Sequence, residues 1–411
     1  MKKSAHLPDK LIDPEFHANG EAQTLWAWMR KCTPIHWHQP SYLPGFWSIT
    51  CYEDVRAVYS NPQIFSSARG VLLRPLKYGE DPASGITLAL TDPPRHKELR
   101  SLMSGWFTEK YALSLENAIR RKARVFIKKA VDKEISDFTN DIAARLALYV
   151  TCYILGIPDE DQDKVFHWTH EAFEVGKSLA THSQFMLYFG DLMQQRMAKP
   201  ANDLASAIVS GMPGGKLLAE DEILLNYENL LGATENAGLS MAGGVLTLLQ
   251  NPDIWHRLCE HRELLPKAVE ELLRWSSSAT HSMRAVTRAT MFKGQQFAEG
   301  DRVVLWLPSA NRDEKVFTDP FQINITRTPN RHLALGHGRH FCIGNALARI
   351  QMRILLTELM GMKWILELVD NPTPTKSIYV SGPAALPVQF SAKARRLPSN
   401  VSRDAENFVA R

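Results

Sequence analysis

The 411-residue sequence contains no run of about 18 apolar residues, which argues against a transmembrane helix. Its first residues, MKKSAHLPDK, lack the apolar stretch of a secretory signal. Cysteine is scarce: there are 5, an odd number, and no two of them form a Cys-x-x-Cys pair. A disulfide framework and a zinc ribbon are therefore disfavoured, and a reducing compartment fits better. We expect a soluble, cytoplasmic protein with no membrane segment.

The charge balance also lacks a strong excess of one sign. The formal net charge is +4, and the lysines and arginines are spread along the chain rather than gathered in a tail. This distribution argues against nucleic acid as a partner. A local basic patch that receives an acidic partner remains compatible with it. The sequence also lacks internal repeats and low-complexity segments.

Hydrophobic patterning predicts a largely helical protein. Apolar residues recur at i, i+3 and i+4 in the stretches 115–130, 138–155, 160–176 and 183–198. Strand-like pieces are short and comprise Phe46–Cys51, Arg302–Leu307 and Leu386–Phe390. The length alone suggests two or three domains. We expect the polar ends, about residues 1–10 and 398–411, to be mobile.

The segment Asp221–Leu249 is long, helix-like and poor in charge in its second half. Gly232-Ala233 interrupts it in the middle and Gly243-Gly244 near its end. Glycine inside a helix costs about 1 kcal/mol relative to alanine. The glycines indicate either close helix packing or a core helix that opens locally, where another group lies against its backbone.

The most informative stretch is Leu333-Ala-Leu-Gly-His-Gly-Arg-His-Phe-Cys342-Ile-Gly344, which precedes a strong helix former. A cysteine at a helix N-terminus meets free N–H donors and a partial positive charge, which favour thiolate. Gly336, Gly338 and Gly344 allow the backbone to approach a bulky flat partner and to donate N–H groups to the sulfur. This combination suggests a metal-bound thiolate.

Other interpretations of the same stretch stay open on the residues alone. Lone cysteines are usually small buried hydrophobic residues. His337, His340 and Cys342 would supply only three zinc ligands, whereas structural zinc generally takes four in paired spacing. A dinucleotide-binding loop requires a different glycine spacing. A catalytic Cys/His pair is a further, weaker alternative.

The stretch resembles the heme-binding signature of the cytochrome P450 family, F-x-x-G-x-[RH]-x-C-x-G. Leu335 stands at the phenylalanine position, Gly338 and Gly344 match the glycines, and His340 takes the Arg/His position. The resemblance implies heme b with Cys342 as its axial thiolate ligand, flanked by Gly336 and Gly344. It extends over nearly the whole chain and implies a mainly α cytochrome P450 fold. Residues 1–411 would then form a single triangular helical domain with a small β-rich side, which overrules the estimate from length.

Two further constellations fit the resemblance. Glu271 and Arg274 match the family's E-x-x-R pair, whose third partner is usually an arginine; we expect Gln322 in its place. The heme propionates need cations or donors when partly buried. The family spacing assigns this role to His96, Arg100, Arg284 and His332.

The interrupted segment resembles the family's oxygen-activating helix, [AG]-G-x-[DE]-T. Gly232 and Ala233 match the bend, and Glu235 matches the acid. Asn236 replaces the threonine whose hydroxyl helps to deliver protons. An amide relays protons less readily than a hydroxyl. The resemblance therefore assigns catalytic roles to Glu235 and Asn236, with water or a substrate hydroxyl replacing the missing alcohol.

The resemblance also implies partners. The chain has no flavin or nicotinamide motif, so electrons would come from a ferredoxin and an NAD(P)H-dependent reductase, with Arg339, Arg349 and Arg353 near the docking site. We expect a monomer. The substrate would be small, mostly apolar and either free or carrier-bound, with Arg74, Lys77 and Tyr78 available to an acidic group. Expected substrate-contacting residues are Val71, Leu72, Leu88, Phe173, Leu179, Gly232, Ala279, His281 and Val380.

Three functions follow as hypotheses. The first is a monooxygenase that hydroxylates or epoxidises a natural-product intermediate, for which analogy with similar bacterial enzymes suggests a polyketide-like scaffold. The second, suggested by Asn236, is a heme-thiolate catalyst of oxidative coupling or a peroxide-driven enzyme. The third is a catalytically silent relative that binds another enzyme, although such a relative would have no need to retain Cys342.

Overall fold

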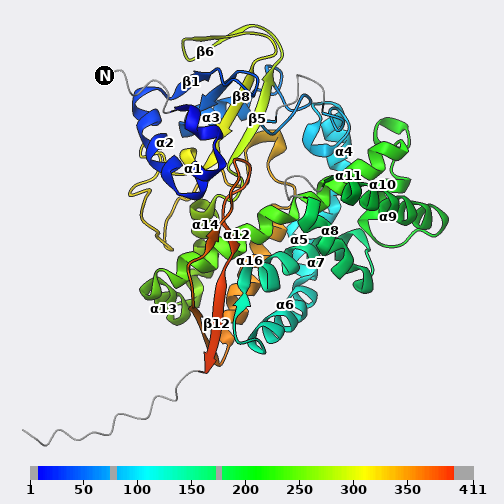
Figure 1. Ribbon diagram of the computed structural model, residues 1–411. Helices are drawn as coiled ribbons and strands as arrows, with labels where there is room; N and C mark the ends of the chain where they lie inside the picture. Colours follow the sequence, from blue (N-terminus) through cyan, green and yellow to red (C-terminus); the bar gives the residue numbers. More distant parts are fainter. Residues whose placement is uncertain (1–7, 75–80, 173–177, 393–411) are drawn as a thin grey trace, which may run out of the picture.

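The computed structural model describes residues 8–74, 81–172 and 178–392, and for 170–172 and 178–182 the backbone alone. It is mainly helical, with the strands gathered largely at one side (Figure 1). The α-helices are α1 (Pro14–Ala18), α2 (Glu21–Cys32), α3 (Tyr52–Tyr59), α4 (Arg95–Ser104), α5 (Glu109–Ser114), α6 (Glu116–Val131), α7 (Ala144–Leu155), α8 (Gln162–Ala172), α9 (Ser178–Ala198), α10 (Leu204–Ser210), α11 (Glu220–Gly232), α12 (Thr234–Leu249), α13 (Pro252–Glu260), α14 (Leu265–Ser276), α15 (Leu307–Ala310) and α16 (Asn345–Gly361).

The largest sheet has five strands in the order β1-β2-β8-β5-β3, and the remaining strands form smaller sheets of two or three. The strands are β1 (Ile35–His38), β2 (Phe46–Ile49), β3 (Phe65–Ser66), β4 (Ser136–Asp137), β5 (His281–Val286), β6 (Thr290–Phe292), β7 (Gln295–Phe297), β8 (Arg302–Trp306), β9 (Trp364–Leu368), β10 (Thr373–Pro374), β11 (Pro383–Ala385) and β12 (Pro387–Ala392). In the part of the chain that the structure describes, no helix combines the length and the apolar character needed to cross a membrane.

Most predicted elements are confirmed, with local differences. The stretch 138–155 begins with a π-helical turn, Phe138–Ala143, before α7. Residues 8–10, which were expected to be mobile, belong to the 3-10 helix Pro8–Ile12, in which Leu11 is fully buried; residues 1–7 lie outside the described part of the chain. The C-terminal end 398–411 lies outside the described residues. Phe46–Cys51, Arg302–Leu307 and Leu386–Phe390 correspond to β2, β8 and β12, each shifted by one or two residues at an end.

The strand β5 separates two hydrophobic clusters because successive side chains of a strand point to opposite faces. Met283 belongs to the cluster beneath α1 and α2, together with Leu73 and Trp306. Val286 belongs to the cluster that surrounds α3. The odd-numbered positions 281 and 283 therefore face one cluster, and the even-numbered positions 284 and 286 face the other.

The helix α12 crosses the helical part of the molecule next to α7 and α14 (Figure 1). Its glycines permit close packing: a Cβ on Gly238 would lie 3.0 Å from the Cα of Ala144, and one on Gly243 would lie 3.2 Å from the Cβ of Ser276. Close packing is thus the reason for glycine at these two positions. At 232–233 the helix is instead interrupted, between the end of α11 and the start of α12.

Candidate functional site

The loop before Cys342 is held in a fixed shape against the end of α3. Gly336 and Gly338 have φ values of +73° and +71°, which side chains with a Cβ rarely adopt. A Cβ on Gly338 would also lie 2.9 Å from the carbonyl oxygen of Tyr59. The N–H of Cys342 donates to the carbonyl of Leu335 at 2.8 Å. These constraints explain the glycines and fix the direction of the cysteine.

Cys342 lies three residues before α16, and its sulfur accepts a hydrogen bond from the N–H of Gly344. Burial raises the pKa of the Cys342 thiol, and the Gly344 N–H, Arg100 and Arg349 lower it by less. The expectation that the helix terminus favours a free thiolate is therefore wrong, because desolvation outweighs it. A metal ion that binds the sulfur displaces the thiol proton, so this burial remains compatible with a metal ligand.

Four of the predicted residues form one cluster of cationic and imidazole side chains beside Cys342: His96, Arg100, Arg284 and His340. The rings of His96 and His340 lie 4.1 Å apart between centroids. Burial, reinforced by the neighbouring cations, lowers the pKa of His96 to about 4 and that of His340 to about 3. The cluster therefore carries positive charge on its arginines while its imidazoles are neutral.

Among the described residues, the carboxylate that acts on this cluster is that of Asp92, which accepts from the Ser66 hydroxyl and the Ser67 N–H and is hydrogen-bonded to none of the four side chains. Arg284 is 4% exposed and donates only to the hydroxyl of Ser282 and the carbonyl of Met283, while its guanidinium lies over the ring of Tyr59. The Nε2 atom of His340 is buried, and the described part of the chain offers it no hydrogen-bond partner. Cations that are withdrawn from water without a directly bonded anion are costly. An anionic group beside Cys342 would compensate them, and the two propionates of a heme meet this requirement.

His332 lies elsewhere. Its Nε2 is 3.2 Å from a carboxylate oxygen of Glu270, and its Nδ1 accepts the N–H of Ala334. Arg349 binds the same carboxylate at 2.6 Å. Burial raises the pKa of Glu270, but its bonds to His332 and Arg349 outweigh burial and bring the pKa to about 2. With both ring nitrogens engaged within the protein, His332 does not join the cluster beside Cys342.

The third partner of Glu271 is Arg327, so the prediction of Gln322 is wrong. Arg274 binds the Glu271 carboxylate through two bonds of 2.8 Å, and the Nε of Arg327 lies 3.0 Å from the same group. Gln322 contributes only its backbone carbonyl, which accepts from both arginines. The sequence signal was present, since Arg327 is the one arginine between Asp319 and Asn330.

The bend consists of a break between α11 and α12 at Ala233. Burial raises the pKa of Glu235 to about 7, with no opposing partner. The Oδ1 atom of Asn236 is buried, and no described residue is hydrogen-bonded to it. The nearby hydroxyl of Thr234 donates to the carbonyl of Leu231 within the helix, so it does not replace the missing threonine. The bend thus presents a protonatable acid and an unpaired amide oxygen.

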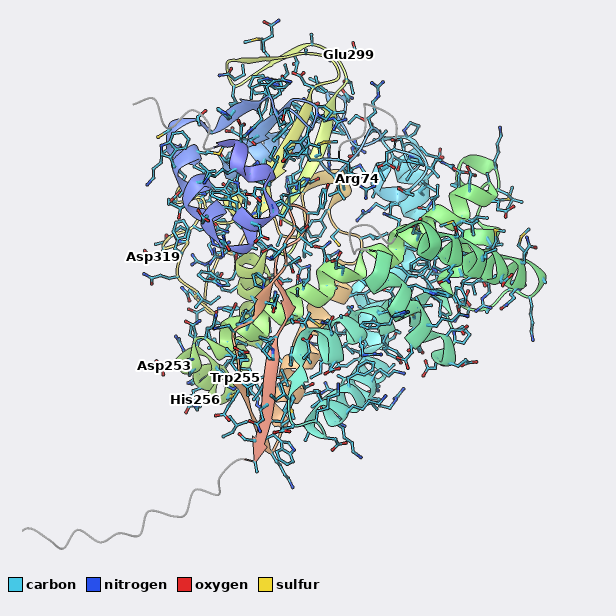
Figure 2. The ribbon with its side chains drawn as sticks, viewed as in Figure 1. Arg74, Asp253, Trp255, His256, Glu299 and Asp319 are labelled. Atoms are coloured by element: carbon cyan, nitrogen blue, oxygen red, sulfur yellow. The ribbon has the colours of Figure 1, made fainter. Side chains whose placement is uncertain are left out.

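The predicted substrate-contacting residues lie on separate segments. Val71 and Leu72 are half-buried, Leu88 is buried, and Ala279 pairs with Val380 in an isolated bridge. Gly232 ends α11. Phe173, with Lys77 and Tyr78, lies outside the described residues, and of Leu179 only the place in α9 is described. Arg74 lies at the border between the β-rich part and the helices (Figure 2).

His281 differs from expectation, and the position of Leu88 depends on a residue that the sequence did not reveal. His281 is 3% exposed, and both of its ring nitrogens bond to backbone groups, so it is not a direct polar contact for a ligand. Asn226 on α11, which was not predicted, accepts the N–H of Leu88 and donates to the carbonyl of Ile86. The sequence does not indicate which backbone groups an asparagine on a helix will bond, because these groups come from a distant segment.

A groove of about 690 Å³ lies beside the N-terminal half of α16. Its walls include Leu113, Pro266, Ile350, Arg349 and Arg353. Arg349 is paired with Glu270, and Arg353 lies 2.9 Å from Glu116. Both arginines expected to form a basic patch are therefore partly neutralised within the chain; Arg339 is exposed.

The zinc alternative finds no support in the part of the chain that is described. There, no three His, Cys, Asp or Glu side chains are grouped so as to hold a metal ion. A metal at Cys342 would have to bring its remaining ligands with it, as the iron of a heme does.

Comparison with known proteins gives a consistent result. A family model described as Cytochrome P450 matches residues 193–362. The steroid C26-monooxygenase of Mycolicibacterium smegmatis is 32% identical over 410 residues, covering 96% of this chain and 99% of that protein. The cytochrome P450 NovI of Streptomyces niveus is 30% identical, covering 93% and 96%. The crystal structure of P450 OxyD, involved in the biosynthesis of vancomycin-type antibiotics, has a TM-score of 0.86, 29% identity and coverage of 93% and 99%.

Proposed function

The chain belongs to the cytochrome P450 family, and from this premise we propose that Cys342 is the axial ligand of its heme b and that the substrate is a natural-product intermediate. The chain has the fold of this family and is a heme monooxygenase, an oxidoreductase that incorporates one oxygen atom. Heme ligated by a cysteine thiolate supplies the oxygen-activating chemistry.

The observation that carries the proposal is the cluster of His96, Arg100, Arg284 and His340 beside Cys342, in which no side chain is hydrogen-bonded to a carboxylate of the described residues. These side chains would hold the heme propionates through charge-assisted hydrogen bonds. The Gly344 N–H would reduce the electron density on the sulfur. The rigid turn at Gly336 and Gly338 would keep the ligand in place.

Proton delivery is proposed for the bend. With its pKa near 7, the Glu235 carboxyl is close to half-protonated at neutral pH and can both accept and release a proton. The unpaired oxygen of Asn236 can accept a hydrogen bond from a water or from a substrate hydroxyl. Glu235 would then supply protons, and Asn236 would orient the molecule that carries them.

The natural-product substrate is supported by the side chains and by the names of similar proteins. Val71, Leu72, Leu88 and Val380 are apolar, which suits a mostly hydrophobic scaffold. OxyD takes part in antibiotic biosynthesis, while another similar protein is a steroid C26-monooxygenase. A steroid is a bulky, largely apolar molecule. A hydroxylation or an epoxidation of such a scaffold is the proposed reaction.

Electrons are proposed to come from a ferredoxin that docks near the groove beside α16. The apolar groove walls and the adjacent arginines would suit a small acidic protein. Because Arg349 and Arg353 already have carboxylate partners, the attraction would be moderate and sensitive to salt.

The decisive experiment is the optical spectrum of the reduced protein with carbon monoxide. A strongly red-shifted Soret band requires an axial thiolate, and we expect it. If folded, heme-loaded protein lacks this band, the proposed ligation is refuted.

Asn236 stands where the family pattern has threonine, and this favours one alternative to monooxygenation, a peroxide-driven or coupling reaction. The two reactions differ in their oxidant. Product formed with NAD(P)H, reductase and ferredoxin in the presence of oxygen supports monooxygenation. Product formed only with added peroxide supports the alternative.

A further inference from the structure

His281 joins three segments that are far apart in the sequence. Its Nδ1 lies 2.8 Å from the carbonyl oxygen of Ile378, and its Nε2 lies 3.0 Å from the backbone nitrogen of Leu73. A carbonyl can only accept and a backbone N–H can only donate. Nδ1 must therefore carry the proton and Nε2 must be bare, which assigns one neutral tautomer to His281.

The same three segments are connected by further bonds around this ring. The hydroxyl of Tyr379 donates to the carbonyl of Leu73 at 3.0 Å, so both backbone groups of Leu73 are held by side chains. The N–H of Met283 donates to the carbonyl of Val71 at 2.7 Å. The ring of His281 also packs edge-on against Trp306, 5.4 Å away between centroids. Leu73 itself is fully buried in that cluster.

The residues expected to contact substrate are next to these bonds. Val71 and Leu72 directly precede Leu73, Ala279 lies two residues before His281, and Val380 lies two residues after Ile378. Ala279 and Val380 are paired in a bridge. A displacement of any of the three segments would therefore move at least one expected wall of the substrate site.

We infer that His281 is a positioning residue, which sets the shape of the substrate site by fixing residues 71–73, the start of β5 and residues 378–380 relative to one another. The inference rests on the proposed function, since it concerns the substrate site of that enzyme. His281 does this from behind the site, on the face of β5 opposite to Arg284.

The surroundings keep the ring neutral at physiological pH. Burial lowers the pKa of His281 from 6.5 to about 4, the Ile378 carbonyl opposes this, and His17 lowers it slightly. Among the described residues, the Tyr379 ring also lies against His281, 5.7 Å away between centroids, and Arg74 is close enough to act on Tyr379. Because the folded pKa is below the unfolded value, the stability that neutral His281 contributes is present above pH 6.5 and is lost as pH falls towards 4.

Three substitutions at position 281 distinguish the contributions of the two ring nitrogens. His281→Asn would place an amide near the position of Nδ1, and His281→Gln would place one near the position of Nε2. His281→Phe keeps an aromatic ring against Trp306 but leaves the Leu73 N–H and the Ile378 carbonyl unpaired. His17→Phe is the matched control, because His17 also stacks on Trp306 and bonds a carbonyl, that of Leu11, without touching Leu73.

The first readout is hydrogen exchange of the backbone amide of Leu73, which needs neither substrate nor catalysis. Loss of its acceptor should accelerate exchange about tenfold or more in His281→Phe and His281→Asn. His281→Gln and His17→Phe should stay near wild type. Tyr379→Phe, a milder change, should affect the same segment in the same direction. Equal exchange in wild type and His281→Phe would overturn the inference.

The second readout compares the affinities of two probes, 4-phenylimidazole and imidazole. The binding of each is measured through the shift in the optical spectrum of the heme. The phenyl ring should reach the walls of the substrate site, whereas imidazole alone should not. We expect His281→Phe to weaken 4-phenylimidazole about tenfold and imidazole less than about twofold. Equal weakening of both probes would mean a general loss of structure and would reject the inference. A missing carbon monoxide band in the wild type would instead refute the proposed heme ligation, whatever the exchange data show.

Discussion

Arg327 and Glu271 are 56 positions apart in the sequence, yet the Nε of Arg327 lies 3.0 Å from the carboxylate of Glu271 in the interior. Glu271 is fully buried and Arg327 is 9% exposed. Burial raises the pKa of Glu271, but Arg274, the Asn324 N–H and Arg327 together lower it below its ordinary value. The irregular segment that carries Arg327 is thus fixed to α14 by an ion pair shielded from solvent.

Arg327→Gln should destabilise the protein strongly, because it leaves a buried carboxylate with less compensating charge. Breaking a buried pair from one side typically costs about 3–5 kcal/mol, and we expect the lower part of this range since Arg274 remains. The free energy of unfolding is measured with denaturant. Gln322→Ala is the control and should change it by less than about 0.5 kcal/mol, since only the backbone of Gln322 is used. Similar losses in the two variants would contradict the pairing.

Cys342→Ser should abolish the red-shifted carbon monoxide band and oxygen transfer, because a serine hydroxyl does not supply the thiolate. The other four cysteines provide matched controls. Cys32→Ser, Cys51→Ser, Cys152→Ser and Cys259→Ser should keep the band. Loss of the band in any of these four, with folding and heme content retained, would show that the ligand is assigned to the wrong cysteine.

Glu235→Gln should change how stability depends on pH. A carboxyl whose folded pKa is raised to about 7 stabilises the folded state below its unfolded value of 4.5, and this contribution is lost as pH rises through 7. The decline in unfolding free energy between pH 5 and pH 8 should therefore be smaller in Glu235→Gln than in wild type. Parallel curves would show that Glu235 does not titrate in this window.

The same bend should control coupling between electron use and product. If water or a substrate hydroxyl delivers protons, Asn236→Thr should retain activity, and Glu235→Gln should slow oxygen activation. If the amide of Asn236 itself orients substrate or oxygen, Asn236→Thr should release peroxide instead. Product formed per NAD(P)H consumed is measured together with peroxide. Unchanged rate and coupling in Glu235→Gln would remove this bend from the proton route.

Charge changes beside the groove should alter reduction by an acidic ferredoxin in opposite directions. Arg353→Gln should slow reduction at low salt because it leaves Glu116 with one cation fewer. Glu116→Gln should accelerate it. Raising ionic strength to about 0.15 M should reduce both differences, since screening there acts over about 8 Å. Rates that are insensitive to both substitutions at low salt would exclude this surface as the docking site.

The sequence was most informative where the chemistry is local. The turn at Gly336 and Gly338, the approach to Cys342 and the start of α16 lie within about a dozen residues, so spacing alone defines them. The pairing of Glu271 with Arg274 is equally local, one turn apart on α14. His96 and Arg100 are one turn apart on α4 and lie in the same cluster. The resemblance to the family assigned the roles of these residues, and short-range geometry explains why the members of each pair lie together.

The errors concern contacts that only the three-dimensional path of the chain determines. Gln322 and Arg327 lie in an irregular segment without periodicity. The single arginine of this segment was a signal for the third partner, but spacing alone does not state which of the two side chains points inward. His332 was assigned by its distance from Cys342, but Glu270 on a different helix attracts it. The direction of His281 follows from the register of β5 against β8, where it is opposite Trp306. Such pairings require the complete fold.

The two-sided character of β5 bears on how new substrate preferences could arise. Positions 281 and 283 face the segment at 71–73, whereas Arg284 faces the cluster beside Cys342. Substitutions on the first face can therefore remodel the substrate site while cofactor retention is left intact. A mutant library restricted to positions 281 and 283, with compensating changes at 71–73, should yield mainly heme-loaded enzymes with diversified selectivity. A library at position 284 should yield mainly variants that fail to retain heme.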